Sequence, residues 1–199
     1  MTREMTMGAR TNKRTNKVNV IDVESTCWDG DPPQGQVSEI IQVGISVIHV
    51  PSATIEQSES IFVRPERSEV SEFCTKLTGI TQEQANAGVK FADLAHKLEK
   101  KFDGKDYLFA SYGDYDRSMF DRMCRMHEVR YPFGSRHLNI KTLLAISLGW
   151  EREVGMDEAL RRLALPLEGR HHNAVDDCRN IAKLFLCLVR NARELQTGT

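Results

Sequence analysis

The sequence predicts an α/β domain in which one mixed β-sheet carries helices on its faces. Two observations point to this fold class. Three strand-like stretches follow one another early in the chain with short turns between them, which suggests an antiparallel meander. Most of the remaining chain shows the apolar spacing of amphipathic helices, interrupted by one short apolar run. Strands followed by helices and further strands favour a mixed sheet.

Apolar alternation and turn residues mark the strands. The second predicted strand is the clearest, because Ile41, Val43, Ile45 and Val47 alternate with other residues. A loop at residues 29–36, rich in Gly and Pro, separates it from the first. The predicted strands span residues 18–24, 39–50, 60–63 and 107–110.

Periodic apolar stripes and one capping signal mark the helices. Thr81 and Gln84 have the spacing of a capping box, which predicts that a short helix opens there. The longest stripe is the C-terminal one, which predicts a long amphipathic helix. The other predicted helices and this one span residues 91–102, 116–127, 139–148, 156–163 and 174–195.

Bulk composition fits one domain, predicted at residues 18–195, in a chain of 199 residues with a formal net charge of −1. Residues 1–17 hold five basic residues against one acid, which predicts a flexible basic tail. The remaining 22 basic and 27 acidic residues argue against a broad phosphate-binding surface. Five scattered cysteines without a CxxC pair argue against a zinc knuckle or a disulfide framework, and a cytoplasmic location is expected. No membrane helix or signal peptide is expected.

Two carboxylates, Asp22 and Glu24, stand two residues apart at the end of the first predicted strand. Side chains at this spacing point to the same face of a strand. Neighbouring carboxylates repel each other, and a fold tolerates them where a cation neutralises the pair or where one acid stays protonated. Hard oxygen ligands suit Mg²⁺ or Mn²⁺. The pair alone also fits a solvated strand end, so the other segments decide between these interpretations.

Acidic residues recur where two later helices are predicted to begin. Asp114 and Asp116 follow the short apolar run, and Asp116 fits either a helix N-cap or a ligand that faces a metal. His172 precedes the long C-terminal helix, and Asp177 lies about one turn inside it, so both can face one cavity. The alternative is compensation of the helix dipole beside a surface histidine. Jointly, the four acids Asp22, Glu24, Asp116 and Asp177 and the histidine His172 suit metal-assisted hydrolysis.

Three segments resemble the exonuclease motifs of the DEDDh 3′–5′ exonucleases. They are Ile21-Asp-Val-Glu-Ser-Thr-Cys-Trp28, Ser111-Tyr-Gly-Asp-Tyr-Asp-Arg117 and His172-Asn-Ala-Val-Asp-Asp177. The His-x4-Asp spacing of the third segment points to the DEDDh branch rather than the tyrosine-bearing DEDDy branch. Within that branch, three stretches resemble the Eri-type RNA exonucleases, namely Thr26-Cys-Trp28, Phe73-Cys-Thr-Lys-Leu-Thr-Gly-Ile-Thr81 and Gly155-Met-Asp-Glu-Ala-Leu160.

This resemblance implies a ribonuclease-H-like fold, with a five-stranded mixed sheet flanked by helices. It also implies two Mg²⁺ or Mn²⁺ ions and a histidine general base. His172 takes the position of the base in preference to His171, because only His172 lies five residues before Asp177. The positions of metal ligands fall on Asp22, Glu24, Asp116 and Asp177. The positions beside the terminal nucleotide fall on Thr26, Cys27, Trp28, Thr78, Gly79 and Ile80.

The activity that the resemblance implies is release of nucleoside 5′-monophosphates from 3′ ends of single-stranded RNA. Trp28 would stack on a base unless it belongs to the core, and a contact to a 2′-OH would favour RNA. Three alternatives stay open. They are a DNA-directed 3′–5′ exonuclease of proofreading or repair, a catalytically silent binding module for nucleic acid or protein, and a structural cation site without a nuclease role.

Overall fold

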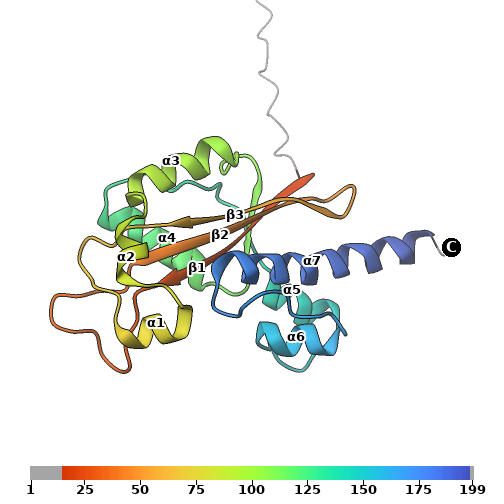
Figure 1. Cartoon of the computed structure of the whole chain (residues 1–199). Helices are drawn as coiled ribbons and strands as arrows, with labels where there is room; N and C mark the ends of the chain where they lie inside the picture. Colours follow the sequence, from red (N-terminus) through yellow and green to blue (C-terminus); the bar gives the residue numbers. More distant parts are fainter. Residues whose placement is uncertain (1–14, 198–199) are drawn as a thin grey trace, which may run out of the picture.

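One mixed sheet organises residues 15–197, the part of the chain that the computed structural model describes (Figure 1). Its strand order is β3-β2-β1-β4-β5. β2 runs antiparallel to both β1 and β3, whereas β4 runs parallel to both β1 and β5. The bounds are β1 Lys17–Ser25, β2 Ile40–His49, β3 Thr54–Phe62, β4 Leu108–Ser111 and β5 His137–Asn139. The prediction of a five-stranded mixed sheet is confirmed.

The strands differ from the predicted ones mainly at the two edges of the sheet. β3 begins at Thr54, well before the predicted residue 60, because its first half is polar and partly exposed and so lacks apolar alternation. β5 has three residues, too few to give a periodic signal. Lys17, the last residue of the predicted tail, is the first residue of β1. Residues 1–14 of that predicted tail lie outside the described residues.

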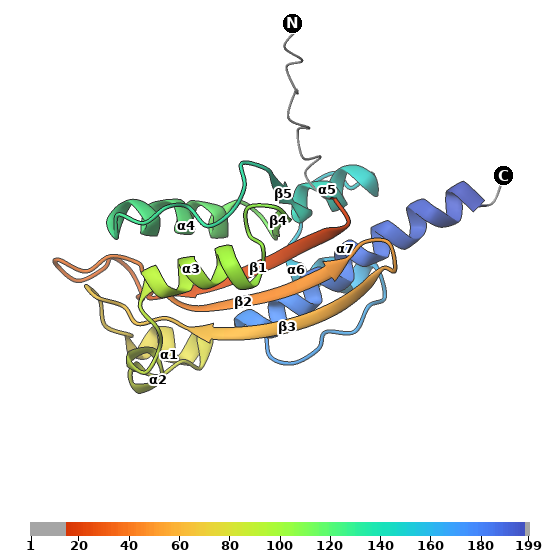
Figure 2. The same cartoon turned by 90° about the horizontal axis from the view of Figure 1, so that it is seen from above.

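Helices cover both faces of the sheet (Figures 1 and 2). α3 and α4 lie on one face, whereas α5, α6 and α7 lie on the other. Their bounds are α1 Glu72–Thr78, α2 Gln82–Asn86, α3 Phe91–Lys101, α4 Tyr115–Met126, α5 Ile140–Ser147, α6 Met156–Arg162 and α7 Ala174–Thr197. The capping box of Thr81 and Gln84 is present at the start of α2. α1 was not predicted, because seven residues are too few to give a clear helical period.

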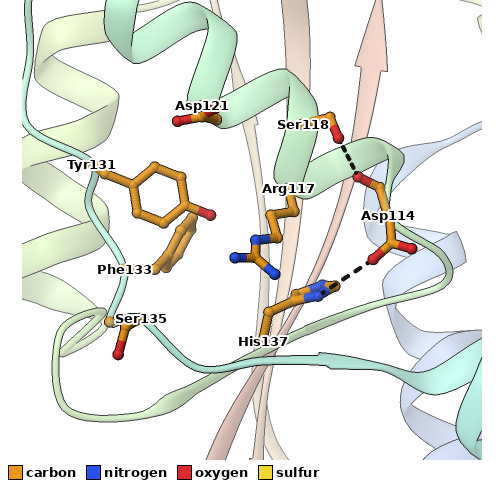
Figure 3. Close-up of a pocket in the computed structure, with 9 residues that line it drawn as sticks. Asp114, Arg117, Ser118, Asp121, Tyr131, Phe133, Ser135 and His137 are labelled. Atoms are coloured by element: carbon orange, nitrogen blue, oxygen red, sulfur yellow. Dashed lines mark hydrogen bonds and ion pairs between the residues drawn. The ribbon is translucent and has the colours of Figure 1, made fainter.

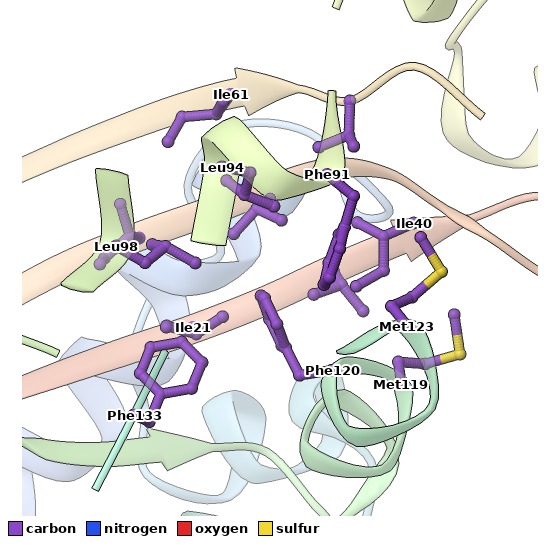
Figure 4. Packing of buried hydrophobic residues seen from close by; sticks show 14 of the residues in the cluster. Ile21, Ile40, Ile61, Phe91, Leu94, Leu98, Met119, Phe120, Met123 and Phe133 are labelled. Carbon is purple, nitrogen blue, oxygen red and sulfur yellow. The ribbon is translucent and has the colours of Figure 1, made fainter. Parts of the chain in front are cut away.

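The apolar core lies in two layers, one on each side of β1. On the first side, Phe91 of α3 and Phe120 of α4 pack with Ile21 of β1 (Figure 4). On the second side, Val18 and Val20 pack with residues of α5, α6 and α7. Successive side chains of β1 therefore alternate between the two layers, as a strand requires.

The first turn of α7 rests directly on β2 at Gly44. A Cβ atom at Gly44 would lie 2.0 Å from the carbonyl oxygen of Ala174, so only glycine permits this contact. Gly44 is paired with Asp22 in the ladder between β1 and β2. The start of α7 is thereby held next to the middle of β1.

Across residues 15–197, none of the helices combines the length and the apolar character needed to cross a membrane.

Candidate active site

The alternation of β1 separates its acids from its apolar residues. Ile21 and Val23 point into the layer formed with α3 and α4. Asp22 and Glu24 therefore point to the opposite face, toward the start of α7. Asp22 is partly buried and Glu24 is buried.

Two helix starts bring further carboxylates to this face. Asp116 lies in the first turn of α4 and is 4% exposed, and its Oδ1 accepts a hydrogen bond of 2.9 Å from the amide of Val23. The N-cap of α4 is Asp114, so the alternative of Asp116 as an N-cap is wrong. Asp177 lies in the first turn of α7 and is also 4% exposed. The pairing of β4 with β1 and the seat of α7 on Gly44 position these two helix starts.

The acids and histidines share one cavity of about 350 Å³. Carboxylate oxygens of Asp22, Glu24 and Asp177 lie within 4.8 Å of one another. Asp116, His171 and His172 line the same cavity. The structure thus brings together all four acids and the histidine that the sequence singled out.

Burial and mutual repulsion make these carboxylates hard to ionise. Burial raises the pKa of Glu24 to about 8, and repulsion from Asp177 and Asp116 adds to it. Burial likewise raises the pKa of Asp116 to about 7, against the stabilising hydrogen bond from Val23. The pKa of Asp22 lies well above its ordinary value, first through burial and then through the other three acids. The pKa of Asp177 is also raised by burial, although its histidine contacts oppose the shift.

A divalent cation fits this arrangement. Within residues 15–197, the carboxylates of Asp22 and Glu24 have neither a hydrogen-bond donor nor a basic ion-pair partner. Carboxylate oxygens without such partners, close together and partly shielded from water, are the ligands that Mg²⁺ and Mn²⁺ prefer. Ion binding would also remove the repulsion that raises the pKa values.

The two histidines meet Asp177 in different ways. His172 donates its backbone amide to Oδ2 of Asp177 at 2.9 Å, whereas Nδ1 of His171 lies 3.2 Å from both carboxylate oxygens. Their imidazole rings stack with centroids 4.1 Å apart. Burial lowers the pKa of His172, and the neighbouring His171 lowers it further. His172 is therefore largely neutral near pH 7, the state in which an imidazole can accept a proton.

The cavity walls include aromatic and apolar residues that the sequence reasoning missed. Tyr112, Tyr115, Leu77 and Met156 all line the cavity. The hydroxyl of Tyr115 lies 2.7 Å from that of Ser25, which ties the start of α4 to the end of β1. Tyr115 stands between Asp114 and Asp116, and Tyr112 lies two residues before Asp114, so aromatic residues close to these acids were the available signal.

Most of the residues predicted beside the terminal nucleotide do not line the cavity. Thr26 is fully buried; its amide donates to the carbonyl of Glu39, and its hydroxyl accepts from the amide of Glu39. Thr78 and Ile80 are buried at the end of α1, and Gly79 ends that helix with a φ of 79°. None of these four residues lines the cavity, and their contact with the terminal nucleotide stays a prediction.

Only one member of the predicted Thr26-Cys27-Trp28 wall reaches the cavity. Cys27 lines it, whereas Trp28 is half-buried and does not. Leu77, which precedes Thr78 in the chain, lines the cavity, whereas Thr78, Gly79 and Ile80 do not. Burial and the neighbouring Cys74 raise the pKa of Cys27 to about 12, so its thiol stays protonated and serves as a packing group rather than a nucleophile.

The chain is similar to known exonucleases. The family model described as Exonuclease matches residues 19–185. The 3′-5′ exoribonuclease 1 of Rattus norvegicus is 30% identical over 187 residues, which cover 89% of this chain and 54% of that protein. The chain thus spans about half the length of such curated relatives. The Probable 3′-5′ exonuclease KapD of Bacillus subtilis strain 168 is 27% identical, with 92% of this chain and 89% of that protein covered.

A solved structure has the same architecture. The nuclease domain of 3′hExo, a DEDDh family member bound to rAMP, superposes with a TM-score of 0.82 at 27% identity. The match covers 89% of this chain and 93% of that one.

Proposed function

The chain belongs to the Exonuclease family, and on that premise we propose that it removes nucleotides one at a time from the 3′ ends of single-stranded RNA. Its predicted place among the DEDDh, Eri-type exonucleases and its predicted ribonuclease-H-like fold are confirmed. The observation that carries the proposal is the convergence of Asp22, Glu24, Asp116 and Asp177 beside His172 in one cavity.

The proposed ligands of the divalent ions are the four acids. The family is dependent on divalent metal, and we assign two Mg²⁺ or Mn²⁺ ions to Asp22, Glu24, Asp116 and Asp177. When bound, such ions lower the pKa of water, and they stabilise negative charge on the attacking and leaving oxygens. The absence of basic ion-pair partners for Asp22 and Glu24 among the described residues supports this assignment.

The proposed reaction needs one proton acceptor, and we assign that role to His172. Water attacks the phosphorus of the last phosphodiester, one proton of this water passes to the imidazole of His172, and the bond from phosphorus to the 3′ oxygen breaks. The 3′ oxygen leaves with the bonding electrons and takes a proton from solvent. The products are a nucleoside 5′-monophosphate and a strand shortened by one residue. The lowered pKa of His172 keeps the ring ready to accept the proton near neutral pH.

The walls of the cavity support cleavage at a chain end and at RNA. Tyr115, Leu77 and Met156 offer aromatic and apolar surface against which a terminal nucleoside can lie. The relatives named exoribonucleases and the rAMP held by the similar nuclease domain favour a ribonucleotide. Within the described residues all five cysteines are free thiols, which supports the expected cytoplasmic location.

Matched RNA and DNA oligomers labelled at the 5′ end, with Mg²⁺, with Mn²⁺ and with chelator, test the proposal. We expect a ladder of RNA shortened from the 3′ end, release of nucleoside 5′-monophosphates, and no reaction with chelator. Faster loss of the DNA ladder would instead indicate the DNA-directed alternative. A 3′-phosphorylated RNA that is cut as fast as RNA with a free 3′ hydroxyl would indicate an endonuclease.

A further inference from the structure

A second cavity, of about 660 Å³, opens on the other flank of the N-terminal half of α4 (Figure 3). It lies between α4 and the segment 131–137, and among the described residues it shares no lining residue with the catalytic cavity. Asp116 and Arg117 are neighbours at the start of α4, and successive helical side chains diverge by about 100°. The two cavities therefore lie on adjacent flanks of one helix start.

The cation of this second cavity is Arg117. Its guanidinium points between Tyr131 and His137 (Figure 3), and within residues 15–197 it has neither a hydrogen bond nor an ion pair. Burial and the charge of Arg117 lower the pKa of His137, so that ring stays neutral. Arg117 is thus the one uncompensated positive charge among the lining residues.

The two acids of the cavity already have partners. Asp121 forms an ion pair with Arg125 one turn along α4. Asp114 accepts a hydrogen bond of 3.1 Å from Nδ2 of Asn139, and Nδ1 of His137 lies 3.7 Å from its other oxygen. Neither carboxylate forms an ion pair with Arg117, so the guanidinium of Arg117 is free to bind an anion.

An aromatic ring stands beside the guanidinium. Tyr131 is half-buried and packs edge-on against Phe133, with centroids 5.6 Å apart. Within the described residues its buried hydroxyl has no hydrogen-bond partner. A buried hydroxyl without a partner costs stability unless a ligand or water satisfies it.

We propose that the Arg117 cavity binds a nucleotide unit of the substrate strand that lies upstream of the cleaved 3′ residue. The guanidinium of Arg117 holds a backbone phosphate, for which its planar fork is suited, and Tyr131 contacts the attached sugar or base. This inference rests on the proposed function. It extends that function from the terminal nucleotide to a second contact on the strand.

A strand phosphate fits the cavity better than a free mononucleotide. A phosphodiester carries one negative charge, whereas a terminal phosphate carries between about 1.5 and 2 at neutral pH. Asp114 and Asp121 line the same cavity and repel the more highly charged group more strongly. At the start of α4 the neighbouring residues Asp114 and Tyr115 line the Arg117 cavity and the catalytic cavity respectively, so the two cavities open close to each other.

Equilibrium binding of fluorescent oligoribonucleotides in chelator, where hydrolysis is absent, tests the proposal. Arg117→Gln is compared with Arg117→Lys and with Arg161→Gln, a control arginine that is exposed on α6, forms no ion pair among the described residues and lines neither cavity. For a decanucleotide we expect Arg117→Gln to weaken binding by roughly tenfold and to reduce the salt slope by about 0.7. Arg117→Lys should bind with an affinity between those of Arg117→Gln and the wild type, because lysine keeps the charge without the planar fork, and Arg161→Gln should bind like the wild type.

Strand length separates this site from the catalytic cavity. The loss caused by Arg117→Gln should be larger for a decanucleotide than for adenosine monophosphate, which has no upstream unit and can fill only the catalytic cavity. Equal losses for both ligands, or equal losses in Arg117→Gln and Arg161→Gln, would overturn the proposal. Adenosine monophosphate that binds the wild type but not Arg117→Gln, with decanucleotide binding unchanged, would show a free-nucleotide site instead.

The proposed exonuclease activity can fail independently of this inference. If the wild type hydrolyses no RNA in Mg²⁺ or Mn²⁺, the proposed function is wrong, whereas a binding difference between Arg117→Gln and Arg161→Gln still supports a strand site.

Discussion

The backbone amide of His172 donates a hydrogen bond of 2.9 Å to Oδ2 of Asp177, so the proposed base and a proposed metal ligand fix each other in place. The φ of His172 is 63°, in the left-handed region that residues other than glycine rarely adopt. The hydrogen bond to a buried carboxylate offsets the cost of this conformation, and such strain is common at functional sites. The pairing separates the main-chain role of His172 from the role of its imidazole.

Removal of the His172 imidazole should reduce turnover while ion binding persists. We expect His172→Ala to lower kcat by about 10²- to 10⁴-fold, since general-base catalysis contributes that much. The hydrogen bond from the backbone amide of residue 172 to Asp177 survives the substitution, so the Mg²⁺ or Mn²⁺ affinity measured by calorimetry should change little. His171→Ala is the matched control, and a larger loss of kcat there would assign the base to His171 instead.

The stacked His171 should set the lower pH limit of the reaction. His171 lowers the pKa of His172, and the proposed base acts only when neutral. Replacing His171 by Ala should therefore move the acidic limb of the pH profile of kcat/KM to higher pH. Profiles of the wild type and His171→Ala at saturating Mn²⁺ measure the shift. An unmoved limb, or one moved to lower pH, contradicts the assignment.

Neutralising Asp22 should abolish activity and stabilise the ion-free protein. Asp22→Asn keeps the shape of the side chain but removes a charge that repels three other acids. We expect turnover to fall by at least about a thousandfold, because several kcal/mol of metal-dependent stabilisation is lost. In chelator the melting temperature should rise by about 2–4 °C for each kcal/mol of relieved repulsion. Wild-type turnover in this variant would end the proposal.

Without divalent ions, the folded protein should lose stability as pH rises. Glu24 and Asp116 have folded-state pKa values of about 8 and about 7, well above the ordinary values of 4.5 and 3.8. The folded state thus binds more protons than the unfolded state between about pH 4 and pH 8, so the free energy of unfolding falls across that window. Each fully titrating carboxyl contributes at most about 1.4 kcal/mol per pH unit.

Urea unfolding in chelator near the two ends of that window measures this loss of stability. Saturating Mg²⁺ at the upper end should restore much of it, since the bound ion favours the ionised carboxylates. A free energy of unfolding that rises with pH in chelator would show that the cluster is not under repulsion.

The contact between β2 and α7 should be intolerant of one added methyl group. In Gly44→Ala the new Cβ would lie 2.0 Å from the carbonyl oxygen of Ala174, so the first turn of α7 must move. We expect a loss of about 1–3 kcal/mol in unfolding free energy. Turnover should fall by up to about a hundredfold because Asp177 moves with the helix. In Gly155→Ala the new Cβ meets nothing within 4 Å, so less than about 1 kcal/mol and little activity should be lost.

Local sequence was enough to predict elements with strong periodicity. The alternation around Asp22 and Glu24 predicted one shared face, because a strand has a period of two. The stripe of α7 predicted a helix that begins at residue 174, where the structure also begins it. β5 and the polar half of β3 escaped prediction, because three residues or an exposed edge strand give no apolar pattern.

The walls of the cavity required the tertiary structure. Thr78 and Ile80 point into the protein while Leu77 faces the cavity, because the packing of α1 decides which side of that helix is buried. The sequence alone suggested that Thr26 could contact a ligand, but its backbone amide and its hydroxyl are hydrogen-bonded to the backbone of Glu39 across the loop between β1 and β2. Such partners lie far along the chain, and no local pattern specifies them.

The local sequence therefore determined which residues carry the chemistry, and the fold determined that they meet in one cavity. Residue types and spacing fixed the acids, the His-x4-Asp relation and the face that Asp22 and Glu24 share, since these depend only on the local repeat of strand and helix. The meeting of Asp116 and Asp177 with that face depended on β4 pairing with β1 and on α7 resting upon Gly44. The cavity at Arg117 arose in the same way, from a segment that packs back against α4. Long-range packing sets such distances, and a one-dimensional pattern does not contain them.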